Sequence, residues 1–261
     1  MIPARPAGVS AEAWAALCGP PLAHRGLWSE GGTPENSLAA FEAAASAGYG
    51  MELDVQLSAD GEAVVFHDDR LEQRLTAASG RIAERLAADL AEVRIKGSDE
   101  AIPTLAQALA QVDGRSLVVI ELKVLGGEVG PLETRVAELL SGYDGPAAMV
   151  SFNPHSVGWF ADNAPRVLRG LNSAAYHDAM NWTIAPEERK ALAELEHVAV
   201  ARPHFLSLGL DMLPSPSADA LRAKGLPVAA WTVRSQAQWA RVARHCDNLM
   251  FEGFRPEART Q

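Results

Sequence analysis

The sequence of 261 residues has two cysteines, no long apolar run and no excess of basic residues, and each of these limits what it can be. Cys18 and Cys246 do not have the spacing of a metal site and nothing requires them to pair, so we expect reduced thiols. No stretch reaches the roughly 18 apolar residues of a membrane span. The N-terminus lacks a charged segment followed by a long apolar run. We therefore expect a soluble, cytoplasmic protein without stable membrane insertion.

The charge balance argues against nucleic acid as a partner. The net charge is −10, which provides no positive surface for nucleic acid or an anionic membrane. An acidic protein that acts on an anionic small molecule needs a local positive site, supplied by a metal ion or by well-placed Arg and Lys. The sequence also lacks a glycine-rich phosphate loop after its first expected strand, which argues against a doubly wound open sheet.

Short apolar runs alternate with helical segments along almost the whole chain. We expect eight strands, at residues 21–24, 50–55, 117–121, 147–151, 167–172, 204–209, 227–231 and 248–251. Helices are expected at residues 10–18, 33–46, 104–112, 131–140, 154–163, 186–196, 216–224 and 236–244. Eight strands, each followed by a helix except at the chain end, are typical of an α/β protein with a (β/α)8 TIM barrel. The expected division is an N-terminal helical extension over 1–19 and a barrel over 20–257, with a small insertion after strand 2 at approximately 69–101.

Residues 50–69 contain the most informative polar pattern. Glu52 and Asp54 are two apart in an expected strand, so their side chains lie on the same face. Buried carboxylates side by side need a cation, a shared proton or an Arg or Lys partner. A turn and a returning strand then lead to His67. The pattern predicts either a metal and proton-transfer site or a polar barrel edge with a solvated histidine.

Other polar residues also fall at the carboxyl ends of the expected strands, where TIM barrels have their active sites. Together with the residues above, the set is His24, Arg25, Glu52, Asp54, His67, Glu121, Lys123 and Trp231. Three carboxylates without a cysteine or a His-x-His pair favour a cation with oxygen ligands, Mg²⁺ or Ca²⁺, over zinc. Two histidines suit general acid and base catalysis, and Arg and Lys suit phosphate oxygens. The combination indicates phosphoryl transfer on a diester.

Five short motifs resemble those of the glycerophosphodiester phosphodiesterase family. They are His24-Arg25-Gly26, Pro34-Glu35-Asn36-Ser37, Glu52-Leu53-Asp54-Val55, His67-Asp68 and Glu121-Leu122-Lys123, and the resemblance covers about residues 20–256. It implies hydrolysis of a small-molecule phosphodiester to glycerol 3-phosphate and an alcohol.

The resemblance also implies a role for each matching residue. The implied acid/base pair is His24 and His67, the metal ligands are Glu52, Asp54 and Glu121, the phosphate contacts are Arg25 and Lys123, and the aromatic at the pocket mouth is Trp231. Glu35 and Asn36 match a motif that supports the site, although helix capping explains these two residues equally well.

The sequence departs from the family at one place, and it leaves several alternative functions open. The last strand runs from Asn248 to Phe254 without the Thr-Asp or Thr-Asn of many relatives, which leaves substrate selection open. The family resembles sphingomyelinase-D-type enzymes, so a lysophospholipase D or sphingomyelinase D-like reaction is an alternative. Two further alternatives are a lyase or aldolase that uses Lys123 as an imine-forming nucleophile and a barrel that only binds phosphoesters. The head group, the nucleophile (water or a substrate hydroxyl) and the oligomeric state are not predicted.

Overall fold

The described part of the chain folds as a closed ring of eight parallel strands. The computed structural model describes residues 3–124, 128–177 and 184–256. The ring contains β1 (Leu22–His24), β2 (Gly50–Leu57), β4 (Val118–Leu122), β5 (Ala147–Ser151), β6 (Leu168–Ser173), β7 (Phe205–Gly209), β8 (Val228–Val233) and β9 (Asn248–Phe251). It is closed because β1 pairs with both β2 and β9. The expected TIM barrel is confirmed, and the expected end of the barrel at Glu257 lies outside the described residues.

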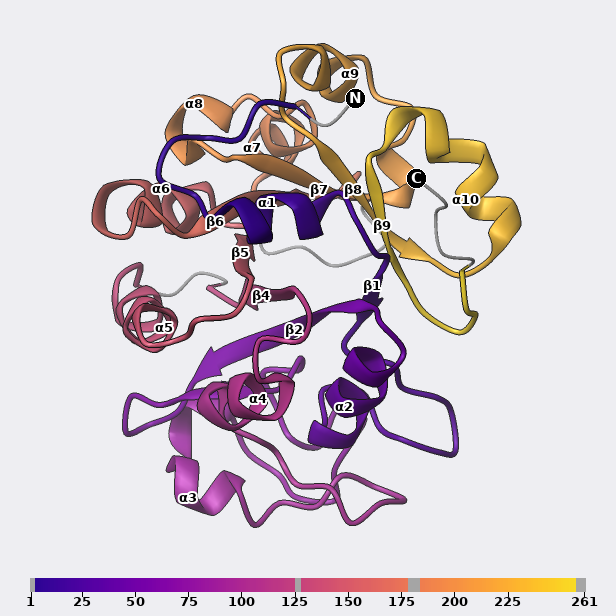
Figure 1. Cartoon of the computed structure of the whole chain (residues 1–261). Helices are drawn as coiled ribbons and strands as arrows, with labels where there is room; N and C mark the ends of the chain where they lie inside the picture. The colour runs from indigo at the N-terminus through magenta and orange to yellow at the C-terminus, as the bar shows by residue number, and fades with distance from the viewer. Residues whose placement is uncertain (1–2, 125–127, 178–183, 257–261) are drawn as a thin grey trace.

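Helices surround the ring and connect successive strands (Figure 1). They are α2 (Leu38–Ser46), α4 (Leu105–Val112), α5 (Pro131–Ser141), α6 (Pro154–Asn163), α7 (Pro186–Ala193), α8 (Val198–Ala201), α9 (Pro216–Ala223) and α10 (Gln236–Val242). Local signals explain several starts: the Thr104 side chain caps α4 in a capping box with Gln107, and Pro154 opens α6 after Asn153. None of the described helices has the length and apolar character that a membrane span requires.

Two expected helix boundaries are wrong. The helix expected from residue 33 begins only at Leu38, because Asn36 has a φ of 54° and the Ser37 side chain accepts a hydrogen bond from Ala40 N as the N-cap. The helix expected over residues 186–196 ends at Ala193, and Leu195 has a φ of 62°. Both errors occur where single residues adopt left-handed backbone conformations that an apolar pattern does not reveal.

The short helix α1 (Ala11–Leu17) covers the amino-terminal end of the barrel, and Figure 1 shows it in front of the strands. Its Trp14 and Leu17 are buried in one cluster with residues that begin the strands, such as Leu22 and Val119. Asn248 of β9 fastens this helix, since its Nδ2 donates to the carbonyl oxygen of Leu17 at 2.8 Å and to that of Pro20 at 3.0 Å. The amino-terminal end is thereby closed, and the polar site lies at the opposite end.

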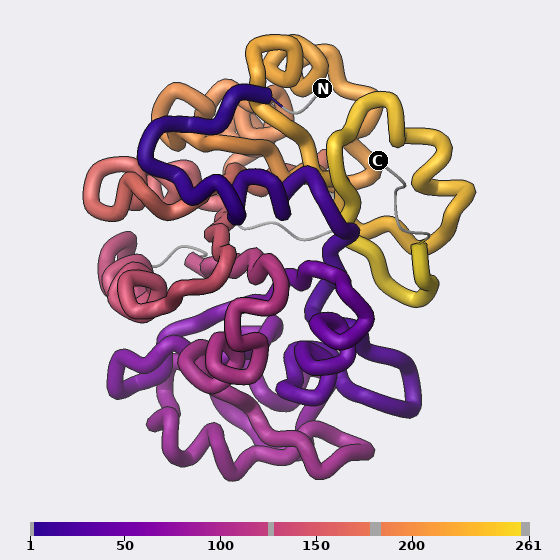
Figure 2. The backbone as a smooth tube through the Cα atoms, in the orientation of Figure 1, coloured from indigo at the N-terminus to yellow at the C-terminus, as the bar shows by residue number. Residues whose placement is uncertain are grey.

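The chain leaves the barrel after β2. β3 (Ala63–Val65) pairs antiparallel with β2 outside the ring, and residues 70–101 follow with η1 (Ile82–Glu84) and α3 (Ala87–Leu90). Leu71, Ile82 and Leu90 of this insertion form a small apolar core with the flanking residues Val64, Phe66 and Ile102. Figure 2 shows it in purple and magenta as a lobe beside the barrel. Because this segment is packed around its own apolar residues, it can hold its side chains in fixed positions.

Candidate active site

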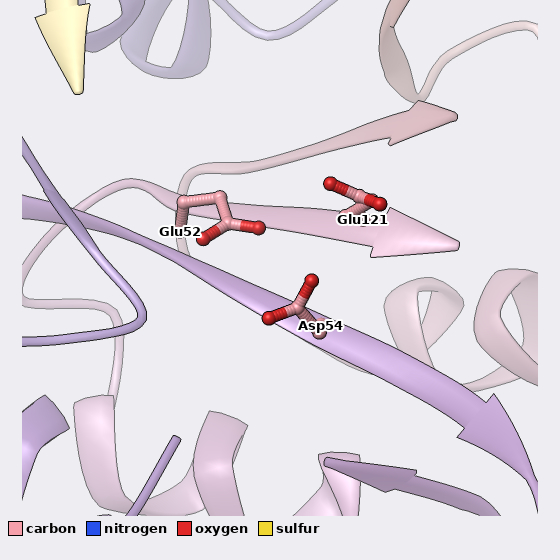
Figure 3. Close-up of side chains that lie close together, drawn as sticks. All are labelled: Glu52, Asp54 and Glu121. Carbon is pink, nitrogen blue, oxygen red and sulfur yellow. The ribbon is translucent and has the colours of Figure 1, made fainter. Parts of the chain in front are cut away.

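Three carboxylates meet at the carboxyl ends of β2 and β4. Glu52 and Asp54 alternate onto one face of β2, and the strand register places Glu121 directly opposite Asp54. All three residues are buried, and one oxygen of each lies within 4.8 Å of the others. Figure 3 shows the three carboxylates turned toward one another. The structure therefore brings together the three acidic residues that the sequence singled out.

Two cations partly neutralise this acidic cluster of Glu52, Asp54 and Glu121. Lys123 Nζ lies 3.0 Å from Asp54 Oδ1 and 2.8 Å from Glu121 Oε1. The Nε of Arg25 lies 3.3 Å from Asp54 Oδ2, and its backbone N–H donates to Glu52 Oε2 at 3.1 Å. Two positive groups against three ionised carboxylates leave an excess of one negative charge. Glu52 Oε1 is buried without a hydrogen-bond partner among the described residues.

The pKa values of the two β2 carboxylates move in opposite directions. Burial, together with the nearby Asp54 and Glu121, raises the pKa of Glu52 well above its ordinary value. Burial would also raise the pKa of Asp54, but Lys123 and Arg25 outweigh it and hold that pKa far below the usual range. The excess negative charge of the cluster therefore makes Glu52 the carboxyl group that is hardest to ionise. The cluster offers three carboxylate oxygens, one of which has no hydrogen-bond partner among the described residues, and it has an uncompensated negative charge. Both properties fit a divalent cation.

Each of the two histidines has its Nδ1 against a carboxylate. His24 ends β1, where its Nδ1 lies 2.9 Å from Glu252 Oε2 and its Nε2 lies 3.9 Å from Glu52 Oε2. His67 follows β3, with its Nδ1 2.8 Å from Asp68 Oδ1. Both imidazoles lie near enough to Asp54 to contribute to its lowered pKa. Since an ionised carboxylate only accepts, each Nδ1 carries the hydrogen and each Nε2 is left for chemistry.

Burial differs between the two rings. Burial lowers the pKa of His24, although the hydrogen bond to Glu252 opposes this shift. Burial would raise the pKa of Glu252, but its contact with His24 lowers that pKa to about 2, so Glu252 is an anion at neutral pH. The side chain of His67 is 31% exposed against 12% for His24. His24 is the inner ring and His67 the outer one.

Glu35 and Asn36 contact site residues directly. Asn36 Nδ2 donates to Asp54 Oδ2 at 2.9 Å, and its Oδ1 accepts from the backbone N–H of Asp54 at 3.3 Å. Glu35 Oε1 accepts from Arg25 Nη1 at 2.7 Å. Helix capping, the other explanation for these two residues, is wrong because Ser37 is the N-cap of α2.

Aromatic side chains form a wall beside the acidic cluster. The Trp231 ring of β8 lies 5.6 Å from the Phe152 ring, which lies 6.3 Å from the Tyr176 ring. Burial raises the pKa of Tyr176 to about 12, and nearby Glu121 adds to the shift, so the phenol stays neutral. Trp231 Nε1 is buried without a partner among the described residues. The wall stands at the carboxyl ends of β5, β6 and β8.

Sequence reasoning missed three contributors to the site. Asn172, in β6, donates through Nδ2 to Glu121 Oε2 at 3.1 Å, and its position near the end of an expected strand was the available signal. Glu252 lies in the segment from Asn248 to Phe254 that departs from the family pattern, and its Oε2 lies 2.9 Å from His24 Nδ1. Arg74 lies in the insertion and pairs with both Glu35 and Asp68, and no local pattern indicates this.

Comparison with known proteins gives one consistent result. Residues 24–246 match the sequence model of the glycerophosphoryl diester phosphodiesterase family. The chain is 29% identical over 230 residues to the Bacillus subtilis protein YhdW, which is named as a glycerophosphodiester phosphodiesterase, and the match covers 85% of this chain and 88% of that protein.

Solved structures of similar proteins agree. An Oleispira antarctica phosphodiesterase in complex with the product sn-glycerol-3-phosphate is 26% identical, with a TM-score of 0.73 over 91% of this chain and 94% of that one. A glycerophosphodiester phosphodiesterase from Thermotoga maritima is 26% identical, with a TM-score of 0.67 over 88% of this chain and 92% of that one.

Proposed function

The chain belongs to the glycerophosphoryl diester phosphodiesterase family, and we propose that the site above hydrolyses glycerophosphodiesters to glycerol 3-phosphate and an alcohol. One observation supports this assignment above all others. The buried cluster of Glu52, Asp54 and Glu121 is flanked by two imidazoles, His24 and His67, that are both oriented by carboxylates. A site that only binds a phosphoester has no use for this pair of oriented rings.

The acidic cluster is the proposed cation site. Glu52, Asp54 and Glu121 would hold Mg²⁺ or Ca²⁺, with Asn36 and Asn172 orienting two of the carboxylates. When bound, the cation supplies positive charge beside the phosphoryl oxygens and favours deprotonation of the attacking hydroxyl.

The two histidines divide the proton transfers. His24, the inner ring, accepts the proton of the attacking hydroxyl (water or the substrate's own glycerol hydroxyl) at Nε2. Glu252 stabilises the imidazolium that results. Attack by the glycerol hydroxyl gives a cyclic phosphodiester, which water then opens to glycerol 3-phosphate. His67, the more exposed ring, acts in its doubly protonated form: Nδ1–H stays on Asp68, and the proton on Nε2 passes to the leaving alcohol, which departs toward solvent. Arg25 and Lys123, held by Asp54, stabilise the charge that grows on the phosphoryl oxygens. Trp231, at the mouth of the site, packs against the carbon atoms of the substrate.

The charge state of Lys123 disfavours the imine-forming alternative. Burial alone would lower the pKa of this amine, but Asp54 and Glu121 raise it above its ordinary value. An amine that stays protonated between two carboxylates is a poor nucleophile. Borohydride trapping with a carbonyl substrate is therefore expected to yield no adduct.

The testing experiment measures glycerol 3-phosphate release from a panel of glycerophosphodiesters and release of the head-group alcohol from a lysophospholipid, with chelator and with added Mg²⁺ or Ca²⁺. We expect cation-dependent release, and a fall in turnover of about 10²–10⁴ for His24→Ala and for His67→Ala. His155→Ala is the control, because His155 is exposed on α6. Near-normal turnover in both site variants would refute the assignment of the histidines. Turnover of the lysophospholipid alone would move the substrate to the lysophospholipase D class.

A further inference from the structure

One residue of the insertion reaches the candidate active site. The Nε of Arg74 donates to both oxygens of Asp68, at 3.2 and 3.1 Å. Its Nη2 and Nη1 donate to the two oxygens of Glu35, at 2.8 and 3.3 Å. A single guanidinium therefore joins two carboxylates that come from separate parts of the chain, and each of these carboxylates binds a proposed catalytic side chain.

Burial shows that the two carboxylates depend on this contact. The side chains of Glu35 and Asp68 are each 6% exposed, whereas that of Arg74 is 44% exposed. Glu35 has a second cation, Arg25, at 2.7 Å. Asp68 has only the His67 ring besides Arg74 among the ion pairs of the described residues. Arg74 is thus the permanently charged partner of Asp68. Glu35 binds the other side of the guanidinium and holds it in place.

The consequence falls on the His67 ring. An ionised Asp68 accepts the hydrogen on Nδ1, which turns Nε2 toward the reaction and stabilises the imidazolium. Without Arg74, the Asp68 carboxylate loses the guanidinium that fixes its plane, and the ring it holds can rotate. A displacement of about 1 Å at a reacting group lowers turnover by about 100-fold.

We propose that Arg74 is a positioning residue: clamped by Glu35, it fixes Asp68 and thereby the orientation of His67. This inference rests on the proposed function, in which His67 transfers a proton. It gives the folded insertion a part in the reaction, since the same segment that packs around Leu71 and Ile82 delivers the guanidinium to the site.

The experiment is a double-mutant cycle in the full chain. Turnover and KM for glycerophosphocholine are measured for wild type, Arg74→Met, His67→Ala and the double variant, with Arg70→Met as the matched control. Arg70 lies in the same insertion, is 46% exposed and pairs with Glu72, which lies outside the site. Arg74→Lys is measured in the same cycle in case the methionine variant does not fold.

We expect Arg74→Met to lower kcat by about 10- to 100-fold in the wild-type background, by less than about 3-fold in the His67→Ala background, and to leave KM within about 2-fold. Arg70→Met should match wild type. Equal losses from Arg74→Met in both backgrounds would overturn the proposal, because the residue would then act without His67. Turnover of Arg74→Met equal to that of Arg70→Met would also overturn the proposal.

A second readout does not depend on turnover. In protein with ¹⁵N-labelled histidine, the signals that disappear in His67→Ala identify this ring. In the neutral form of the His67 ring, we expect wild type to carry the hydrogen on Nδ1, and Arg74→Met to shift the ring toward the Nε2–H tautomer. An unchanged tautomer would overturn the proposal. If no variant and no wild-type protein releases glycerol 3-phosphate, the proposed function fails, and the ring signals still decide the role of Arg74.

Discussion

Replacing Glu52 with glutamine tests the charge balance of the acidic cluster. Oxygens of each carboxylate pair lie within 4.8 Å, so two ionised groups repel by about 3 kcal/mol at an effective dielectric constant of about 20. Glu52 Oε1 has no partner among the described residues, whereas the backbone N–H bond to Oε2 can be kept by an amide oxygen. Without divalent cation, Glu52→Gln should therefore be more stable than wild type by roughly 1–3 kcal/mol, part of one such repulsion.

The assay is thermal unfolding in chelator and in Mg²⁺ or Ca²⁺. A change of 1 kcal/mol moves the Tm of a domain of this size by about 2–4 °C. Wild type should gain about 2.7 kcal/mol when the cation is present at about 100 times its Kd. Glu52→Gln should lose most of that gain, because one ligand has become neutral. The variant is thus more stable than wild type in chelator, and addition of the cation stabilises it by much less than it stabilises wild type.

The pH dependence has a definite sign. Because the pKa of Glu52 is raised in the folded state, this carboxyl group binds more protons in folded than in unfolded protein above the ordinary glutamate pKa of about 4.3. The contribution of Glu52 to the stability of cation-free wild type therefore falls as pH rises from about 4.3 through the raised pKa of Glu52. The advantage of Glu52→Gln should grow with rising pH and vanish as pH falls toward about 4.3.

Glu133→Gln is the matched control, because Glu133 is also buried, has an unpartnered Oε1 and lies outside the acidic cluster at the start of α5. It should leave the response to cation unchanged. The reasoning is refuted if Glu52→Gln is less stable than wild type in chelator, or if it keeps the full shift in Tm on addition of cation.

Three further substitutions test separate parts of the structure. Asn36→Ala removes the amide that donates to Asp54, so cation affinity measured by calorimetry should fall by about 10- to 100-fold, and unchanged affinity would contradict this role. Glu252→Gln loosens His24, so kcat should fall by about 10- to 100-fold while KM stays within about 2-fold, and a change confined to KM would argue for substrate binding instead. Asn248→Ala unfastens α1 from the barrel, so the free energy of unfolding in urea should fall by about 1–3 kcal/mol with kcat unchanged, and wild-type stability would show that the two hydrogen bonds contribute nothing.

The strand positions were predictable because strands of a parallel barrel are buried on both faces and appear as short apolar runs between polar turns. The expected ranges 147–151 and 248–251 coincide with β5 and β9. The start of α2 was not predictable from such a pattern. There the chain makes a loop whose conformation depends on Asn36 reaching Asp54, a contact with a different element.

By itself, the sequence determined the order of strands and helices and most of the polar residues that gather at the candidate site. Spacing by two places Glu52 and Asp54 on one face of a strand, and that is a local property of extended backbone. Only the tertiary structure decided which groups meet: Glu121 opposite Asp54 through the register of β2 and β4, and Glu252 on His24 across 228 residues of sequence. Hydrogen bonds and ion pairs need donor and acceptor within about 3 Å, and that approach depends on strand register and on closure of the ring rather than on the preference of any one segment.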